Sequence, residues 1–236
     1  SCIDVKVMDN EIYANANAGI RVKILDAALF DDAMTETAGS VQISGNEVTV
    51  PEFGWMDEGI IVEQKALALM GDASAVQSVF VGISCNTVVT LEGAWILDGI
   101  VVERCASAPD VGCWMCSSDA VAKICGNLCI EDNTVCASIA SDLVRNCHGI
   151  VVWESVFADK DGTAAVCSDI AISGNSLNLM GGYIVGIGVY KDAFACDEAT
   201  AEICGDLCIA SNYVHIENFQ VDSRQPEFGS SHVVGE

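Results

Sequence analysis

The chain has 236 residues, of which 51% are hydrophobic, and it carries 34 Asp and Glu against 10 Lys and Arg, a formal net charge of -24. A field of this sign repels nucleic acid, anionic lipid and acidic polysaccharide and attracts cations. We therefore expect no nucleic-acid partner and no bound cofactor beyond diffuse bridging of acidic surfaces by Ca²⁺ or Mg²⁺. The chain has no uncharged apolar run of the roughly 18 residues that a membrane-spanning helix needs, so we expect no membrane span.

An internal repeat runs along the chain from its first residues. Branched aliphatic residues stand five and three positions before each of six asparagines and two positions after it; the asparagines are Asn10, Asn46, Asn86, Asn133, Asn175 and Asn212. A spacing of two is the period of a β-strand, so the pattern predicts a strand on each side of the asparagine. Asparagine tolerates the left-handed backbone conformation, and we expect the anchor itself to adopt it at the corner.

A third strand of the form Gly-Ile-x-Val follows in the first five copies, at residues 19–22, 59–62, 99–102, 149–152 and 186–189. The sixth copy lacks it. We interpret residues 1–222 as one β-repeat domain and 223–236 as a polar tail that is a candidate docking segment. Variable loops rich in Ala, Gly, Asp and Ser are expected at 31–40, 70–75, 107–118 and 160–165.

The phrase aliphatic-x-Ile-x-x-Asn-x-Val followed by Gly-Ile-x-Val resembles the coil repeat of right-handed parallel β-helices such as the pectin-lyase-like superfamily. The resemblance covers most of the chain and implies an all-β parallel solenoid of about six coils, spaced about 4.8 Å apart. The alternative is an antiparallel β-meander or sandwich in which each Ser-Gly-Asn is a hairpin turn. We favour the solenoid, because the repeat contains three strands and its corners recur in phase.

Alternation along the third strand gives an apolar position on its outer face. If Ile60 and Val62 point inward, Ile61 points outward, together with Val101 and Val151. The chain's own loops cover this stripe, or it is a contact between subunits. Open solenoid ends also favour end-to-end stacking, since their backbone groups are unpaired.

The cysteines give the second signal. Thirteen cysteines indicate an oxidising compartment, and a chain that opens at Ser1 without a leader is expected to have lost a signal peptide. Cys2, Cys125, Cys167 and Cys204 stand eight positions before their anchors, so the last three, from consecutive repeats, form a column with disulfide spacing. Cys129 and Cys208 share another column but are separated by Ala171, so they need loop or intermolecular partners. The other disulfide candidates are Cys85 and a group expected mostly in or near loops: Cys105, Cys113, Cys116, Cys136, Cys147 and Cys196.

No chemical motif is convincing. Cys113 and Cys116 with Cys125 and Cys129 have too short a spacing for a zinc ribbon, and Asp159-Lys160-Asp161-Gly162 lacks most of a calcium loop. Asp31-Asp32 and His148 match the acids and histidine of β-helix hydrolases only faintly. We predict no metal site, no catalytic residue and no enzyme. Four tryptophans would suit a saccharide groove but are expected under loops, with only Trp153 beside a repeat strand: Trp55, Trp95, Trp114 and Trp153.

These observations favour a secreted structural protein that polymerises with itself into a disulfide-linked extracellular sheath, tube or surface layer, in contact with other cell-surface layer components. In composition and repeat character the chain is similar to the cysteine-rich sheath proteins of filamentous methanogenic archaea. The alternative is a carbohydrate-binding or carbohydrate-degrading β-helix of the tailspike, adhesin or polysaccharide lyase type.

Overall fold

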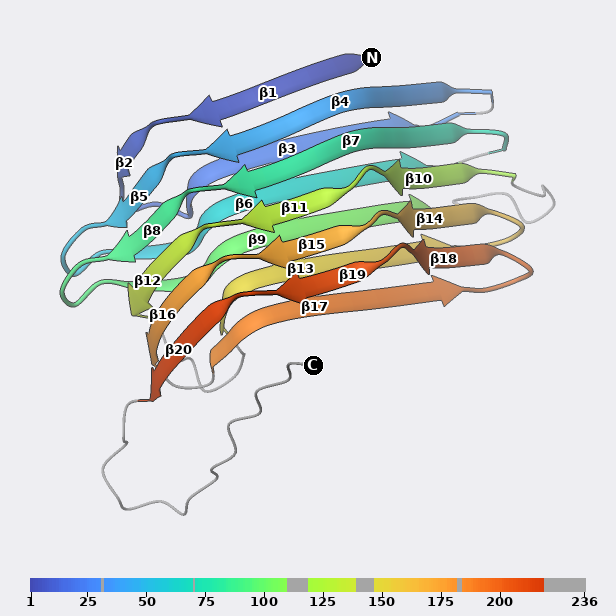
Figure 1. Cartoon of the computed structure of the whole chain (residues 1–236). Coiled ribbons are helices and arrows are strands. Elements are labelled where there is room, and N and C mark those ends of the chain that lie inside the picture. The colour runs from blue at the N-terminus through green and yellow to red at the C-terminus, as the bar shows by residue number, and fades with distance from the viewer. Residues whose placement is uncertain (31, 70, 110–118, 139–146, 182–183, 219–236) are drawn as a thin grey trace.

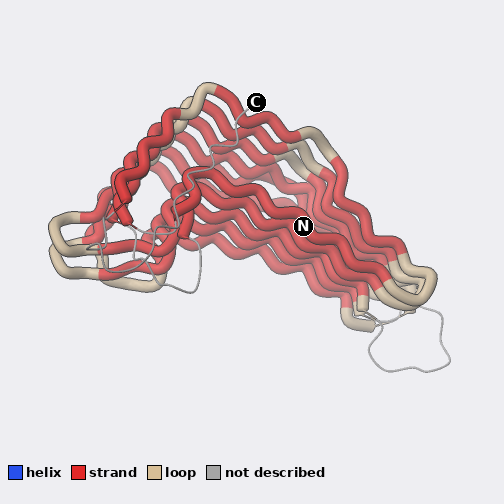
Figure 2. Tube along the Cα trace, turned by 90° about the horizontal axis from the view of Figure 1, so that it is seen from below, coloured by secondary structure: helices blue, strands red, loops and turns tan. Residues whose placement is uncertain are grey.

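A computed structural model describes residues 1–30, 32–69, 71–109, 119–138, 147–181 and 184–218 (Figure 1). Its elements in this part of the chain are β-strands only, and no helix there is long and apolar enough to span a membrane. The strands stack in three parallel sheets, A, B and C, and successive coils follow nearly the same path (Figure 2).

Each of the first five coils contributes one side to each sheet, and the sixth contributes to sheets A and B in the described residues. Sheet A contains β1 (Cys2–Met8), β4 (Met34–Ser44), β7 (Ser74–Ser84), β10 (Val121–Cys125) with β11 (Leu128–Glu131), β14 (Thr163–Cys167) with β15 (Ile170–Ser173), and β18 (Thr200–Cys204) with β19 (Leu207–Ala210). Sheet B contains β2 (Glu11–Tyr13), β5 (Glu47–Val50), β8 (Thr87–Thr90), β12 (Thr134–Ser138), β16 (Ser176–Gly181) and β20 (Tyr213–Asn218). Sheet C contains β3 (Ala18–Ala28), β6 (Trp55–Ala68), β9 (Trp95–Ala108), β13 (Cys147–Ala158) and β17 (Ile184–Ala195).

The register confirms the repeat and the parallel solenoid. Val41 pairs with Val81, and Val81 pairs with Leu128, so the position five before the asparagine stays in one column. The described residues form five coils with three sides and the first two sides of a sixth. The antiparallel meander or sandwich is therefore wrong, and the proposed boundary between 222 and 223 lies outside the described residues.

Two cores of different composition fill the coils. The larger holds branched aliphatic residues from all three sheets, among them Ile43, Val88 and Ile100, which are fully buried. The second lies between sheets A and C and is made mostly of alanine, for example Ala68 and Ala122. Small side chains let the two sheets approach closely there.

The alanine core corrects the predicted loops. The expected loop at 31–40 already belongs to β4 from Met34, and β7, β9 and β14 likewise extend into the loops expected at 70–75, 107–118 and 160–165. Alanine and serine in those segments indicated loops by composition. They are instead the small residues that a tightly packed pair of sheets requires.

The asparagines form a continuous ladder inside the corner between sheets A and B. Asn46 donates its side-chain amide and its backbone N–H to Oδ1 of Asn86, at 2.9 and 3.0 Å, and Asn86 bonds to Asn133 in the same way. The same two bonds join each of the six anchors to the next. Asn46, Asn86, Asn133 and Asn175 are 1% exposed, so the amides satisfy backbone groups that water cannot reach.

The anchor asparagines do not adopt the left-handed conformation, contrary to the prediction. Positive φ angles occur at the residue directly before each anchor: Asp9, Gly45, Cys85, Asp132, Gly174 and Ser211. That residue turns the chain, and the asparagine then uses its side chain to tie one coil to the next.

Candidate functional site

A groove with a volume of about 430 Å³ lies on the outer face of sheet C. The groove lies where the Gly-Ile-x-Val segments interrupt the regular alternation of inward and outward side chains in sheet C. A Cβ on Gly59 would lie 2.6 Å from the carbonyl oxygen of Gly99 and 2.6 Å from Val88 in sheet B, so only glycine fits at this inward corner. Ile60 also points inward, and this local irregularity leaves Glu58 facing the groove, which is lined by Glu58, Asp98, Val101, Glu103, His148, Trp153 and Tyr190.

His148 is the most constrained side chain of the groove. Its Nδ1 lies 2.9 Å from Oδ1 of Asp98, which also accepts the His148 backbone N–H at 2.8 Å. Its Nε2 lies 3.0 Å from the hydroxyl of Tyr190. The residue is 4% exposed, and both ring nitrogens have partners within the chain, which fixes the orientation of the ring.

Aromatic rings flank this histidine. Trp153 and Tyr190 stack with ring centroids 4.1 Å apart, and Trp153 remains 40% exposed. Trp55 and Trp95 form a second stacked pair, at 5.9 Å, at the starts of β6 and β9. The expectation that tryptophans lie under loops is therefore wrong for this pair, which is 40% and 38% exposed; Trp114 lies outside the described residues.

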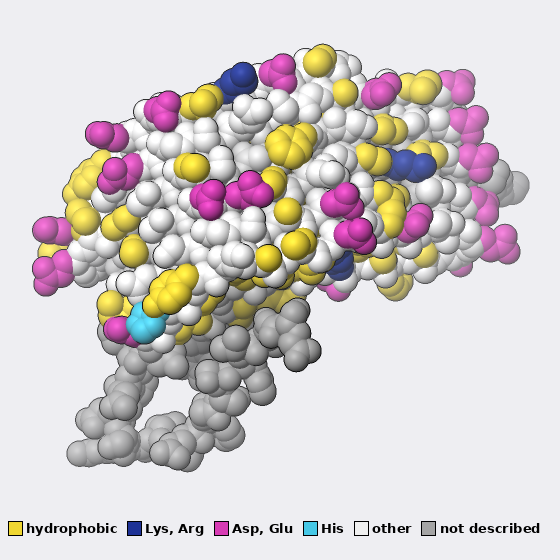
Figure 3. Space-filling model, viewed as in Figure 1, with side chains coloured by type: hydrophobic (Ala, Val, Ile, Leu, Met, Phe, Trp, Pro, Cys, Tyr) yellow, Lys and Arg dark blue, Asp and Glu magenta, His cyan; other side chains and the backbone are white. Residues whose placement is uncertain are grey.

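The groove is electrostatically negative. Burial raises the pKa of Glu58 above its ordinary value, Arg21 offsets part of this effect, and the charges of Asp57, Asp98 and Glu103 add to the rise. The face shown in Figure 3, which carries sheets A and B, also has more acidic than basic side chains. Glu58 thus keeps its proton to a higher pH than an ordinary glutamate, a state that can donate a hydrogen bond.

The predicted outer stripe forms the floor beside this groove. Ile61, Val101 and Val151 pair in register across β6, β9 and β13, yet they are at most 3% exposed and pack with Ala18 and Tyr190. The chain itself covers the stripe. We therefore do not place a contact between subunits there.

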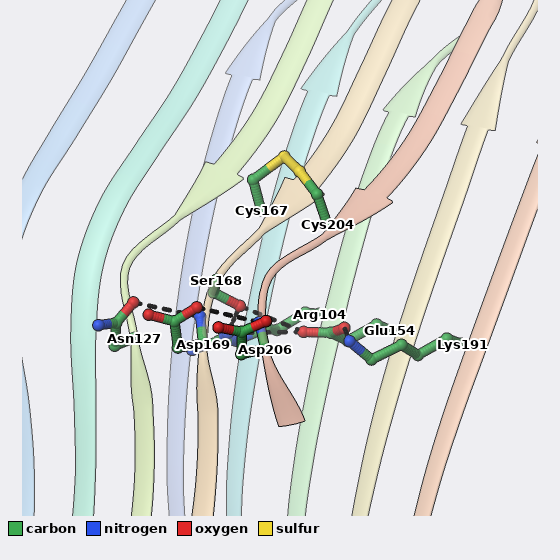
Figure 4. The surroundings of a disulfide bond; sticks show 9 residues. All are labelled: Arg104, Asn127, Glu154, Cys167, Ser168, Asp169, Lys191, Cys204 and Asp206. Carbon is green, nitrogen blue, oxygen red and sulfur yellow. Dashed lines mark hydrogen bonds and ion pairs between the residues drawn. A yellow bond between two sulfur atoms is a disulfide. The ribbon is translucent and has the colours of Figure 1, made fainter. Parts of the chain in front are cut away.

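The predicted cysteine column is present on sheet A, and Figure 4 shows the two of its members that form a disulfide, Cys167 and Cys204. Cys125 pairs with Cys167, and Cys167 pairs with Cys204. Cys167 and Cys204 form a disulfide with Cα atoms 4.5 Å apart, and Cys125 is a free, partly exposed thiol. Cys2 is exposed and pairs with Ala38 at the other end of the same column.

In the second predicted column Cys129 and Cys208 are separated by Ala171 and do not pair with each other, and loop or intermolecular partners for them stay a prediction. Cys129 pairs with Ala171 and Ala171 with Cys208, and both cysteines are free thiols. Burial, followed by the neighbouring Glu131, raises the pKa of Cys129 to about 11. This thiol is therefore a poor nucleophile at neutral pH.

The remaining cysteines, expected mostly in or near loops, lie at or within three residues of a strand end where the structure describes them. Cys105 lies within β9, Cys136 lies within β12 and Cys147 begins β13. Cys85 occupies a left-handed corner, and Cys196 follows β17, where its Sγ lies 3.2 Å from Asp159 Oδ1. That hydrogen bond is the main reason for the raised pKa of Cys196. Cys113 and Cys116 lie outside the described residues.

A buried polar network lies behind the disulfide (Figure 4). Arg104 donates from Nε to Gln64 at 2.8 Å, contacts Ser168, and lies 3.6 Å from Glu154, which also pairs with Lys191 at 3.2 Å. Burial lowers the pKa of Arg104 to about 10, and Glu154 opposes this, so the guanidinium is charged at neutral pH. The network runs across sheet C from β6 through β9 and β13 to β17, with Ser168 contributed from between β14 and β15 of sheet A, and so it ties four coils together.

Metal-binding geometry is limited in the described ranges to one group, Cys167, Glu202 and Cys204. The two cysteines are joined to each other, so this group is a disulfide site in the present state. Residues 159–162 form the turn between β13 and β14 and belong to no metal-binding group. The zinc combination of Cys125 and Cys129 with Cys113 and Cys116 lies partly outside the described residues.

The two ends of the solenoid expose core residues. In the last coil the core columns are open: Leu207, Ile209 and Val214 are 47%, 48% and 41% exposed. In the first coil Val5, Val7 and Ile12 are only partly buried. Within the described residues the asparagine ladder also stops at Asn10 and Asn212.

Comparisons with known proteins found no matching family model, no matching curated protein and no matching solved structure. The fold defines the chain as a parallel β-solenoid. Sequence reasoning missed the groove, although Trp153 and Tyr190 stand at the same repeat position, four residues after the glycines Gly149 and Gly186. That spacing was the available signal.

Proposed function

We propose that the chain is a structural subunit that stacks end to end with copies of itself into a secreted, disulfide-linked sheath, tube or surface layer. The main observation behind this proposal is that the core residues exposed at one end of the solenoid match those at the other end. The columns that are exposed on the last coil, Leu207, Ile209 and Val214, correspond position by position to Val5, Val7 and Ile12 on the first coil.

The polar ladder supports the same arrangement. Each anchor donates its backbone N–H and its amide to Oδ1 of the anchor in the following coil, as Asn175 does to Asn212 at 3.0 and 2.8 Å. Asn212 uses its amide on the carbonyls of Ile172 and Ala210. Oδ1 of Asn10 in a following copy is the acceptor that would continue the series. Stacking in this direction is head to tail, so it gives an open filament rather than a closed dimer.

Charge sets the conditions for assembly. Copies with a formal charge of -24 repel each other, so salt or divalent cations are expected to promote stacking by screening. This is the diffuse role we assign to Ca²⁺ or Mg²⁺.

A charge placed on the open end tests the proposal. Ile209→Asp introduces a carboxylate into the exposed core column, whereas Phe80→Asp does so on the side of a middle coil, at 40% exposure. Sedimentation velocity in salt should show polymers for the wild type and Phe80→Asp and subunits for Ile209→Asp. Circular dichroism must show that both variants are folded. Equal polymerisation of the two variants would reject end-to-end stacking.

The groove on sheet C favours a second candidate function, the binding of a neutral saccharide. Stacked, half-exposed rings beside carboxylates suit sugar rings and their hydroxyls, while the acidic lining disfavours polyuronates. Calorimetric titration with neutral oligosaccharides should show binding that Trp153→Ala abolishes and Trp55→Ala, in the other stacked pair, leaves intact. Equal loss in both variants, or no binding to the wild type, would remove this candidate.

A further inference from the structure

The cysteine column on the outer face of sheet A contains free cysteines in addition to the two that form its disulfide. In register it runs Cys2, Ala38, Ser78, Cys125, Cys167, Cys204. The disulfide occupies the last two positions, at the end where the core is open. A free and exposed thiol, Cys2, occupies the first position.

Head-to-tail stacking makes these two ends neighbours. If the register continues across the joint, Cys2 of the next copy follows Cys204 at one coil spacing, about 4.8 Å. Cys167 and Cys204 are bonded at a Cα separation of 4.5 Å, so the joint reproduces a spacing at which this column already forms a disulfide. The three sulfurs then lie in sequence along the stacking axis.

We propose that the Cys167–Cys204 disulfide is the joining site for a second copy of this chain, which receives the bond through its Cys2. The Cys2 thiolate attacks Sγ of Cys204, and the Cys2–Cys204 bond forms as the Cys204–Cys167 bond breaks. Cys167 leaves as a thiolate and takes up a proton equivalent to the one that Cys2 lost. One disulfide is broken and one is made, so the step needs no oxidant or reductant.

Two surroundings of the bond suit this role. Cys204 lies on β18, the edge strand of sheet A in the described residues, so its outer side has no neighbouring strand. Cys129, a partly buried thiol in the same coil as Cys125, is held protonated by a pKa of about 11 and does not compete. Cys125 is the competitor inside the chain, because its attack on Cys167 would release Cys204 instead.

The inference rests on the proposed end-to-end stacking, and peptide mapping separates the two. The full-length protein is assembled in salt without oxidant, quenched with acid, alkylated and digested for mass spectrometry. We expect a Cys2–Cys204 cross-link between chains, with one newly alkylated Cys167 for each cross-link. A Cys125–Cys167 bond with alkylated Cys204, or a retained Cys167–Cys204 bond in sedimenting polymers, would overturn the exchange while leaving stacking intact.

Two variants sharpen the test. Cys2→Ser should still form polymers by sedimentation but give no covalent ladder on non-reducing gels. Cys125→Ser, the matched removal of a free thiol from the same column, should give the ladder at full yield. A ladder that persists in Cys2→Ser overturns the proposed attacking thiol. Absence of polymers in the wild type overturns the stacking and the exchange together.

Discussion

The middle coils and the last coil place the same kinds of residue in the same columns, with different results. Ile130 and Ile172 are fully buried, whereas Ile209, in register after Ile172, is 48% exposed. A coil of this fold buries only one side of its own core, and the following coil must bury the other. The core side chains of a coil are therefore buried only when another coil stacks on each side. The last coil has the same kinds of core residue as a middle coil, but one side of them is exposed.

The asparagine ladder offers the largest test of this comparison. Asn133→Ala removes bonds to the Ile83 carbonyl and to Asn175 and orphans the donors of Asn86, all in a buried corner. We expect a loss of about 3–5 kcal/mol in the free energy of unfolding of the dissociated subunit. Asn212→Ala should cost about 1 kcal/mol, because water can replace its bonds at the open end. Urea unfolding followed by circular dichroism measures both, and equal costs would contradict the distinction between the coils.

The glycine corner gives an intermediate effect. A Cβ on Gly99 would lie 2.5 Å from the carbonyl oxygen of Gly149 and 2.8 Å from Val135, whereas a Cβ on Gly186 would meet only Val214, which is 41% exposed. Gly99→Ala should therefore destabilise the subunit by about 2 kcal/mol and Gly186→Ala by less than about 1 kcal/mol. Thermal unfolding of the two variants checks the order, and a larger loss for Gly186→Ala would contradict it.

The smallest expected effect lies in the groove. Because burial raises the pKa of Glu58 in the fold, its protonated form stabilises the native state at low pH, and this stabilisation is lost as the pH rises through the raised pKa. Glu58→Gln should therefore raise the melting temperature at pH 7, and the difference should vanish below the ordinary range of a glutamate. Glu92→Gln, at an exposed turn, is the control. A lowered melting temperature for Glu58→Gln at pH 7 would show that its ion pair with Arg21 outweighs burial.

The sequence was sufficient to predict which residues of successive coils lie in register, but it was insufficient to predict the backbone conformation at the corners. Aliphatic spacing around Asn46 and Asn86 predicted the parallel coils, and spacing alone placed Cys167 beside Cys204. The left-handed conformation was predicted for the anchor asparagine, but the residue before it has the positive φ angle. The recurrence of asparagine at the corner does not show which of the two residues turns the chain. The groove depends on Glu58, Asp98 and His148 facing outward through the irregularity at the glycine corner, which strict alternation does not predict.

The axial repeat of the assembled protein tests the central claim most directly. The described chain fills six coil positions on sheets A and B, and at about 4.8 Å each these give a rise of about 29 Å per subunit if copies stack head to tail with the register continued. Helical reconstruction of filaments grown in salt should show this rise along an uninterrupted ladder of strands. Filaments in which subunits contact through the sides of sheets A or C, with a rise unrelated to the coil spacing, would contradict the account.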